Sequence, residues 1–148
     1  MRLKGNLELL EKEVGVQYAG LFVDSRRGII YVGLVKPTRE QMESIINVMR
    51  PSSKVKIVFY EAQLTLRQLE EAADKITARL DELNQAEVPI RGWGVDVVKN
   101  KLIVDFEELR EEYKTIVRQI VGEDIPIEFK KVGPYVLTSK TARYNLLR

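Results

Sequence analysis

Residues 91–106 read RGWGVDVVKNKLIVDF, and residues 19–34, seventy-two positions earlier, read AGLFVDSRRGIIYVGL. An alignment of the two stretches without a gap brings glycine onto glycine, aspartate onto aspartate and two valines onto valines. The matched pairs are Gly20 with Gly92, Val23 with Val95, Asp24 with Asp96, and Val32 with Val104. Self-similarity at a fixed offset is typical of an internal repeat, so the sequence predicts two related structural units.

The middle of each stretch has the residue types of a tight hairpin turn. Gly28 aligns with Asn100, and these are the two residue types that best tolerate the positive φ such a turn requires. Asp24 and Asp96 end the preceding strand, where a carboxylate can accept hydrogen bonds from backbone amides of the turn. We expect all four residues to have a structural role in the turns.

A helix is expected after each hairpin. Thr38 and Gln41 have the spacing of a capping box, and Asp105 and Glu108 are the expected cap in the second copy. Another capping box, Thr65 with Gln68, opens a longer amphipathic helix between the copies, which we expect to continue to about residue 84.

Each copy then returns into an alternating, β-prone stretch. The offset of seventy-two places Val55 on Ile127 and Ile57 on Phe129. The predicted fold class is therefore α+β, with two pseudo-repeated ββαβ units joined by a central amphipathic helix. The expected segments are an N-terminal helix at 1–16, repeat units at 17–62 and 88–132, the central helix at 63–87, and a basic tail at 133–148.

Composition narrows the functional classes. The 148 residues include neither cysteine nor histidine, which removes disulfides, the commonest metal ligands, and cysteine or histidine catalysis. We therefore expect no cofactor, no metal site and no catalytic residue, and a hard-cation site built from carboxylates alone is the remaining alternative for a metal. No apolar run is long enough to span a membrane, and glutamates interrupt the N-terminal stretch where a signal peptide needs an apolar core. The chain as given reads as cytoplasmic, and as secreted if a leader or a flanking protease domain has been removed.

Basic and aromatic side chains are the candidates for binding a partner. Lysines on the two final strands either contact nucleic acid or discourage edge-to-edge aggregation. The second interpretation is favoured, because each copy also carries many acidic residues and the acidic central helix would repel phosphate. The only tryptophan is either packed inside or an exposed anchor. The candidate interaction residues are Trp93, Lys54, Lys56, Phe59, Phe129, Lys130, Lys131 and Tyr135.

Catalysis would need carboxylates from both copies. Asp24 and Asp96 could perform acid/base chemistry only if they converged in one cleft, with one of them desolvated. We favour the turn role for both, so an enzyme remains the less favoured alternative.

The two hairpins, each followed by a helix and a strand, resemble the tandem modules in the pro-regions of secreted bacterial serine proteases of the α-lytic/streptogrisin type. The resemblance covers residues 18–61 and 90–132, and in the second copy it rests on Gly94, Asp96, Asn100, Leu102 and Val104. It implies a folding chaperone and inhibitor that binds its protease partly by adding a strand to it. Strand addition of this kind needs an available sheet edge, which we expect on residues 54–61 and 127–132.

The function predicted from the sequence is thus a non-catalytic protein-interaction module that resembles a protease pro-region. The expected partner is a protein, with strand addition as the expected mode of binding. A nucleic-acid-binding module using the basic strands and the tail is the alternative.

Overall fold

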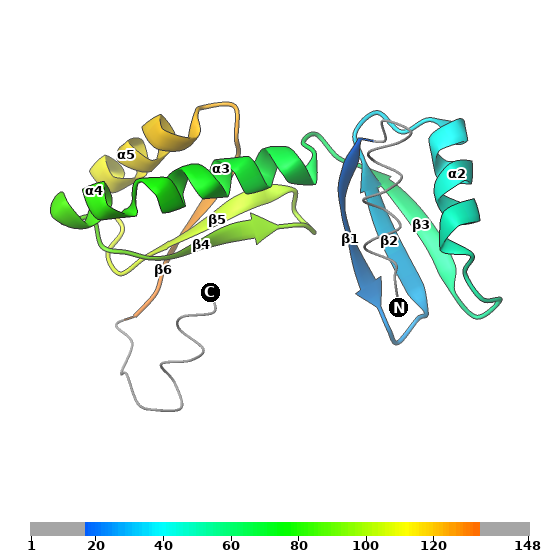
Figure 1. The fold of residues 1–148 in the computed structure, drawn as a ribbon. Coiled ribbons are helices and arrows are strands. Elements are labelled where there is room, and N and C mark those ends of the chain that lie inside the picture. Colours follow the sequence, from blue (N-terminus) through cyan, green and yellow to red (C-terminus); the bar gives the residue numbers. More distant parts are fainter. Residues whose placement is uncertain (1–16, 134–148) are drawn as a thin grey trace. The chain divides into compact units, whose positions relative to one another are not determined.

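The structure is a computed structural model that describes residues 17–133 (Figure 1). Within them the fold is mixed α and β, with two three-stranded sheets and four helices. The predicted N-terminal helix, Tyr135 and the tail from residue 134 lie outside the described residues. The elements in chain order are β1 (Tyr18–Asp24), β2 (Ile29–Leu34), α2 (Arg39–Met49), β3 (Lys56–Glu61), α3 (Leu66–Ala78), α4 (Leu80–Gln85), β4 (Ile90–Asp96), β5 (Lys101–Phe106), α5 (Glu111–Val121) and β6 (Ile127–Lys131).

The chain divides into two compact units. The first extends through Gln68 and includes the turn Val97–Asn100, and the second contains Leu69–Asp96 and the residues from Lys101 onward. The β4–β5 turn therefore belongs to the first unit, although the two strands that it joins belong to the second.

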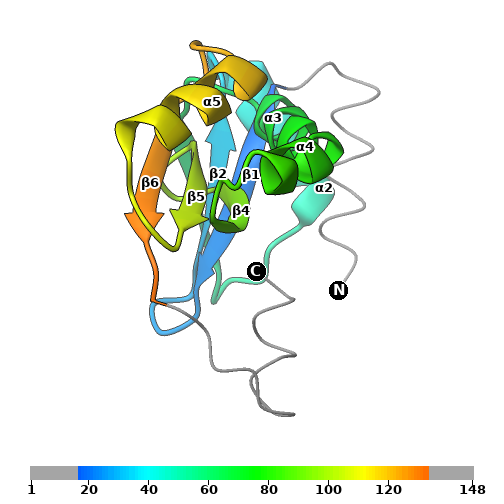
Figure 2. The same ribbon diagram turned by 90° about the vertical axis from the view of Figure 1, so that its left-hand side faces the viewer.

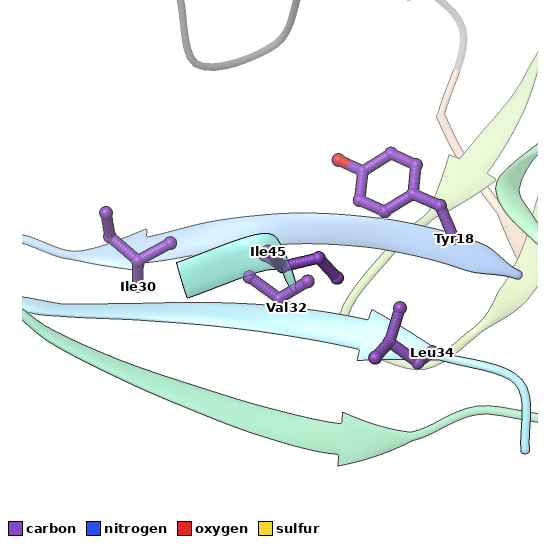
Figure 3. Close-up of a cluster of buried hydrophobic side chains, with 5 residues drawn as sticks. All are labelled: Tyr18, Ile30, Val32, Leu34 and Ile45. Carbon is purple, nitrogen blue, oxygen red and sulfur yellow. The ribbon is translucent and has the colours of Figure 1, made fainter. Parts of the chain in front are cut away.

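The first unit packs one helix on a three-stranded sheet. β1 and β2 form an antiparallel hairpin, and β3 returns parallel to β2 after the α2 crossover. Alternate residues of β2, namely Ile30, Val32 and Leu34, point to one face and pack with Tyr18 and with Ile45 of α2 (Figure 3). This cluster is the core of the unit, because these side chains are almost completely removed from water.

The second unit has the same strand order and pairing. β4 and β5 are antiparallel, and β6 is parallel to β5. Leu102, Val104 and Phe106 alternate along β5 and are fully buried. Helices α3 and α5 lie over this sheet (Figures 1 and 2), and the side chains that they bury are Leu69, Ala72 and Ile76 of α3 and Val117 and Val121 of α5.

Strand pairing corrects the predicted alignment of the final strands. Ile30 pairs with Ile57, whereas Leu102, seventy-two positions after Ile30, pairs with Ile127. Ile57 therefore corresponds to Ile127, and the ungapped match of Val55 with Ile127 is wrong. The cause is a connection between helix and final strand that is two residues shorter in the second unit.

The structure confirms one of the predicted helix N-terminal caps and contradicts another. The capping box at α2 is confirmed, because the Gln41 amide donates to Thr38 Oγ1 and the Thr38 amide donates to Gln41 Oε1, each at 3.2 Å. The predicted cap at Asp105 is wrong, because β5 continues through Phe106 and buries Asp105 within the strand. Helix α5 begins later, after Arg110, whose side chain forms no capping hydrogen bond.

The segment between the sheets is two helices. The Thr65–Gln68 capping box is present, with amide-to-side-chain distances of 2.8 and 3.1 Å. At Arg79 the amide donates to the carbonyl of Ile76, three residues back, so the chain tightens and α3 ends. The single helix predicted to about residue 84 is therefore divided into α3 and α4. Among the described residues, no helix combines the length and the apolar character needed to cross a membrane.

Candidate protein-interaction edges

Each sheet has two outer strands, and the two differ in regularity. The first strand of each sheet contains an irregularity in register, between Tyr18 and Gly20 in β1 and between Ile90 and Gly92 in β4. Such bulges distort an edge and discourage pairing with another strand. β3 and β6 pair with their neighbours in continuous register, so they are the regular edges of the described structure.

Hydrogen bonds define which backbone groups of β3 point outward. The Lys56 amide donates to the Gly28 carbonyl at 2.8 Å, and the Ala62 amide donates to the Leu34 carbonyl at 2.9 Å. Because successive residues of a strand direct their backbone groups to opposite sides, the even-numbered residues bond to β2. The N–H and C=O groups of Ile57, Phe59 and Glu61 therefore point away from the sheet.

β6 has the same arrangement. The Pro126 carbonyl accepts from the Leu102 amide at 3.0 Å, and the Val132 amide donates to the Phe106 carbonyl at 2.8 Å. By the same alternation, the backbone groups of Ile127, Phe129 and Lys131 point outward. Within residues 17–133 no further strand pairs with either edge.

Cations surround the ring of Phe129 at the β6 edge. This ring stacks on Phe106 with centroids 5.7 Å apart. Lys114 Nζ lies 5.9 Å and Arg118 Cζ 5.1 Å from the Phe129 centroid, within the range of cation–π attraction. Lys114 also pairs with Glu111 at 3.0 Å.

The predicted interaction lysines have unlike surroundings. Lys130 pairs with Glu128 at 3.2 Å, and Glu128 also accepts from Lys101 at 2.7 Å, on the sheet face opposite the helices. Lys131 is exposed at the end of β6. Lys56 is exposed at the start of β3, whereas Lys54 lies in the preceding loop, so this strand begins later than predicted.

Trp93 lies on the helix-covered face of the second sheet. It pairs with Val104, it is half-buried, and its indole N–H donates to Thr77 Oγ1 of α3 at 3.0 Å. The tryptophan thus packs between strand and helix within its own unit. Phe59 likewise packs against the core of the first unit, and its backbone is the part that the edge presents.

The predicted turn residues occupy hairpin turns. Asp24 Oδ1 accepts from the Arg27 amide at 3.2 Å, and Gly28 has φ of +65°. Asn100 has φ of +55°. Asp24 belongs to the first unit and Asp96 to the second, each as the last residue of its strand. Within residues 17–133 no group of three or more acidic side chains is placed to hold a metal ion.

Asn100 has a further role that its turn position did not indicate. Its side-chain oxygen accepts from the amides of Gln63 and Leu64, at 3.1 and 2.9 Å, and its amide group donates to the Leu64 carbonyl at 2.9 Å. These partners are more than thirty residues away in sequence, so no local pattern could have predicted them.

The sheet face of the first unit opposite α2 is aromatic, which sequence reasoning also missed. Phe22 stacks on Tyr31 at 4.7 Å and lies 5.7 Å from Tyr60, measured between ring centroids. The Tyr60 ring covers Gly33, and its hydroxyl donates to the Val97 carbonyl at 3.4 Å. Burial raises the pKa of the Tyr60 hydroxyl above its usual value of 10.0. The available signal was the alternation along β2, where Tyr31 stands between the buried residues Ile30 and Val32.

The cations at Phe129 were missed for a similar reason. Lys114 and Arg118 have the i,i+4 spacing that places two side chains on one helix face. At the offset of seventy-two they align with Met42 and Ile46, so an apolar pair in α2 is replaced by a cationic pair in α5.

In comparisons with protein-family models and with curated proteins, this sequence matches none.

Proposed function

We propose that this chain is a non-catalytic protein-interaction module that binds an extended segment of a partner protein by strand addition at the outer edges of β3 and β6. The observation that carries the proposal is the regular outward direction of three residues' backbone groups on each edge. Extended peptides bind to such edges through main-chain hydrogen bonds.

The resemblance to protease pro-regions supports the same mode of binding. On this proposal the two units are repeats of one ββαβ module, joined through α3 and α4, and each module offers one edge. The absence of histidine and cysteine from the sequence further supports a binding role over catalysis.

Proline substitution tests the proposal without disturbing the core. Glu61 and Lys131 are exposed, and their amides point outward, so Glu61→Pro and Lys131→Pro remove an edge donor but no bond of the sheet. The matched control is Lys130→Pro, which is also exposed but removes an amide that bonds to β5. We expect the first two variants to retain the fold and the control to be destabilised, as measured by circular dichroism during urea unfolding.

A synthetic heptapeptide of alternating valine and threonine, labelled with fluorescein, is a suitable probe. Fluorescence anisotropy should show binding to the unaltered protein and a large loss of affinity for the Glu61→Pro/Lys131→Pro double variant. A second peptide, N-methylated on the amides that face the protein, should not bind, because strand addition requires those donors. Equal binding of the methylated and unmethylated peptides would refute strand addition.

A further inference from the structure

The β6 edge carries an excess of positive charge along its second half. Arg118 and Lys114 lie over Phe129 on the helix side, and Lys131 is exposed at the strand end. On the other face Lys130 and Lys101 share the single carboxylate of Glu128. The five cations lie among three carboxylates, because Glu111 pairs with Lys114 and Asp105 is the register partner of Lys130 on β5. The remaining charge is positive and lies beside the outward-pointing backbone.

The first half of β6 is different. Glu123 and Asp124 are exposed in the loop that precedes the strand. The local charge therefore changes from negative to positive along β6, and an added segment would meet the positive end near Phe129 and Lys131.

The corresponding edge of the first unit lacks these cations. In α2, Met42 and Ile46 occupy the positions of Lys114 and Arg118, and Ile46 is an exposed apolar side chain. The pairing of the final strands places Phe59 at the position of Phe129 and Glu61 at that of Lys131. An acidic segment would therefore meet an apolar surface and a like charge along the second half of β3, because the exposed Lys56 lies at the other end of the strand.

We infer that the β6 edge selects an acidic extended peptide and that the β3 edge does not. This inference rests on the proposed strand addition and adds the chemistry of the partner at one of the two edges. Charged groups at the rim of an interface contribute mainly to selectivity and to the rate of association, which decreases with salt.

A peptide satisfies this site better than a nucleic acid. The N–H and C=O groups of Ile127, Phe129 and Lys131 alternate as a strand requires, and only another backbone matches them in register. The carboxylates of Glu111 and Glu128 also lie among the cations, where they would repel a continuous line of phosphates.

The test uses the whole chain and three fluorescein-labelled heptapeptides in which valine alternates with glutamate, lysine or threonine. We expect the glutamate peptide to bind most tightly and its affinity to fall as salt rises. Arg118→Gln/Lys131→Gln should weaken it by about three- to tenfold, since both charges are exposed to solvent, where each contributes modestly. Arg39→Gln on α2 is the matched control, because Arg39 is an exposed cation of the first unit, and it should change nothing.

Amide shifts measured by NMR locate the peptide. The glutamate peptide should shift the amides of Phe129 and Lys131 more than those of Phe59 and Glu61. Equal affinities for the glutamate and lysine peptides would overturn the charge selection, while loss of binding on N-methylation would leave strand addition standing. Glutamate-peptide binding that survives N-methylation would overturn strand addition at this edge. Oligodeoxythymidylate is the competitor that tests for a nucleic-acid site. If it displaces the peptide from the unaltered protein, and if Arg118→Gln/Lys131→Gln no longer binds it, the inference is overturned in favour of a nucleic-acid site.

Discussion

Replacing Gly33 by alanine should destabilise the first unit, and the structure predicts by how much. Gly33 lies in the central strand β2 and pairs with Tyr60 of β3. A β-carbon at this position would lie 2.6 Å from Tyr60 Cζ and 2.7 Å from its hydroxyl oxygen. Carbon atoms in contact are ordinarily about 3.5–4.0 Å apart, so the ring must move by roughly 1 Å. That movement disturbs its packing on Phe22 and its hydrogen bond to Val97.

The expected loss follows from two opposing effects. Overpacking of this kind costs about 1–3 kcal/mol, and the reduced freedom of the unfolded chain returns about 0.4–1 kcal/mol. The free energy of unfolding should therefore fall by up to about 2.6 kcal/mol. Gly94 of β4 is the matched control, because a β-carbon there would meet no heavy atom within 4 Å. Gly94→Ala should raise the free energy of unfolding by about 0.4–1 kcal/mol, which is opposite in sign to the effect of Gly33→Ala.

Urea unfolding followed by circular dichroism measures both variants, and the fluorescence of Trp93 reports on the second unit alone. A double-mutant cycle identifies the cause, because Gly33→Ala should no longer destabilise in a Tyr60→Leu background. The reasoning fails if Gly33→Ala is as stabilising as Gly94→Ala, or if its cost persists when Tyr60 is leucine.

Three further predictions concern the first unit. Thr38→Ala should lower the free energy of unfolding by about 1 kcal/mol, because it removes one half of the capping box, and Thr38→Ser should restore most of the loss in the same urea titration. Asn100→Gly keeps the positive φ but removes three hydrogen bonds to residues 63 and 64, so it should cost about 1–3 kcal/mol, and an unchanged unfolding midpoint would contradict this. The raised pKa of Tyr60 means that the folded state holds the hydroxyl proton more tightly than the unfolded state does. The contribution of this proton to the free energy of unfolding is therefore complete below pH 10, and it is lost as the pH rises through the pKa of Tyr60 in the folded state. Unfolding at increasing alkaline pH should show a shallower loss of stability for Tyr60→Phe than for the unaltered protein.

Local chemistry explains which parts of the fold were predictable. Thr38 and Gln41 satisfy each other's backbone amides within one turn, and Gly28 and Asn100 adopt positive φ within single hairpin turns. Interactions of this range leave a pattern in a few consecutive residues. The strands of both hairpins and the capped helices could therefore be located from the sequence.

Features fixed by distant residues could not be located in this way. The register of the final strands depends on which residue of β2 or β5 each one meets, and a connection shorter by two residues shifts Ile127 onto the position of Ile57. Asp105 has the residue type of a helix cap, but strand pairing with Gly92 and Lys130 extends β5 past it. Tertiary pairing here overrides local preference.

On the proposed binding role, the positions at which the two units differ indicate where a partner would bind. Val32 and Val104 are both fully buried, and every strand-and-helix unit of this kind needs an apolar residue there. No such requirement explains why Arg118 stands where Ile46 does, or why Lys131 stands where Glu61 does, since all four side chains are exposed. Placing cations at one edge adds little to the stability of the fold. Their concentration around outward-pointing backbone groups of one unit therefore supports the proposed binding edge at β6, and it makes the β3 and β6 edges chemically distinct.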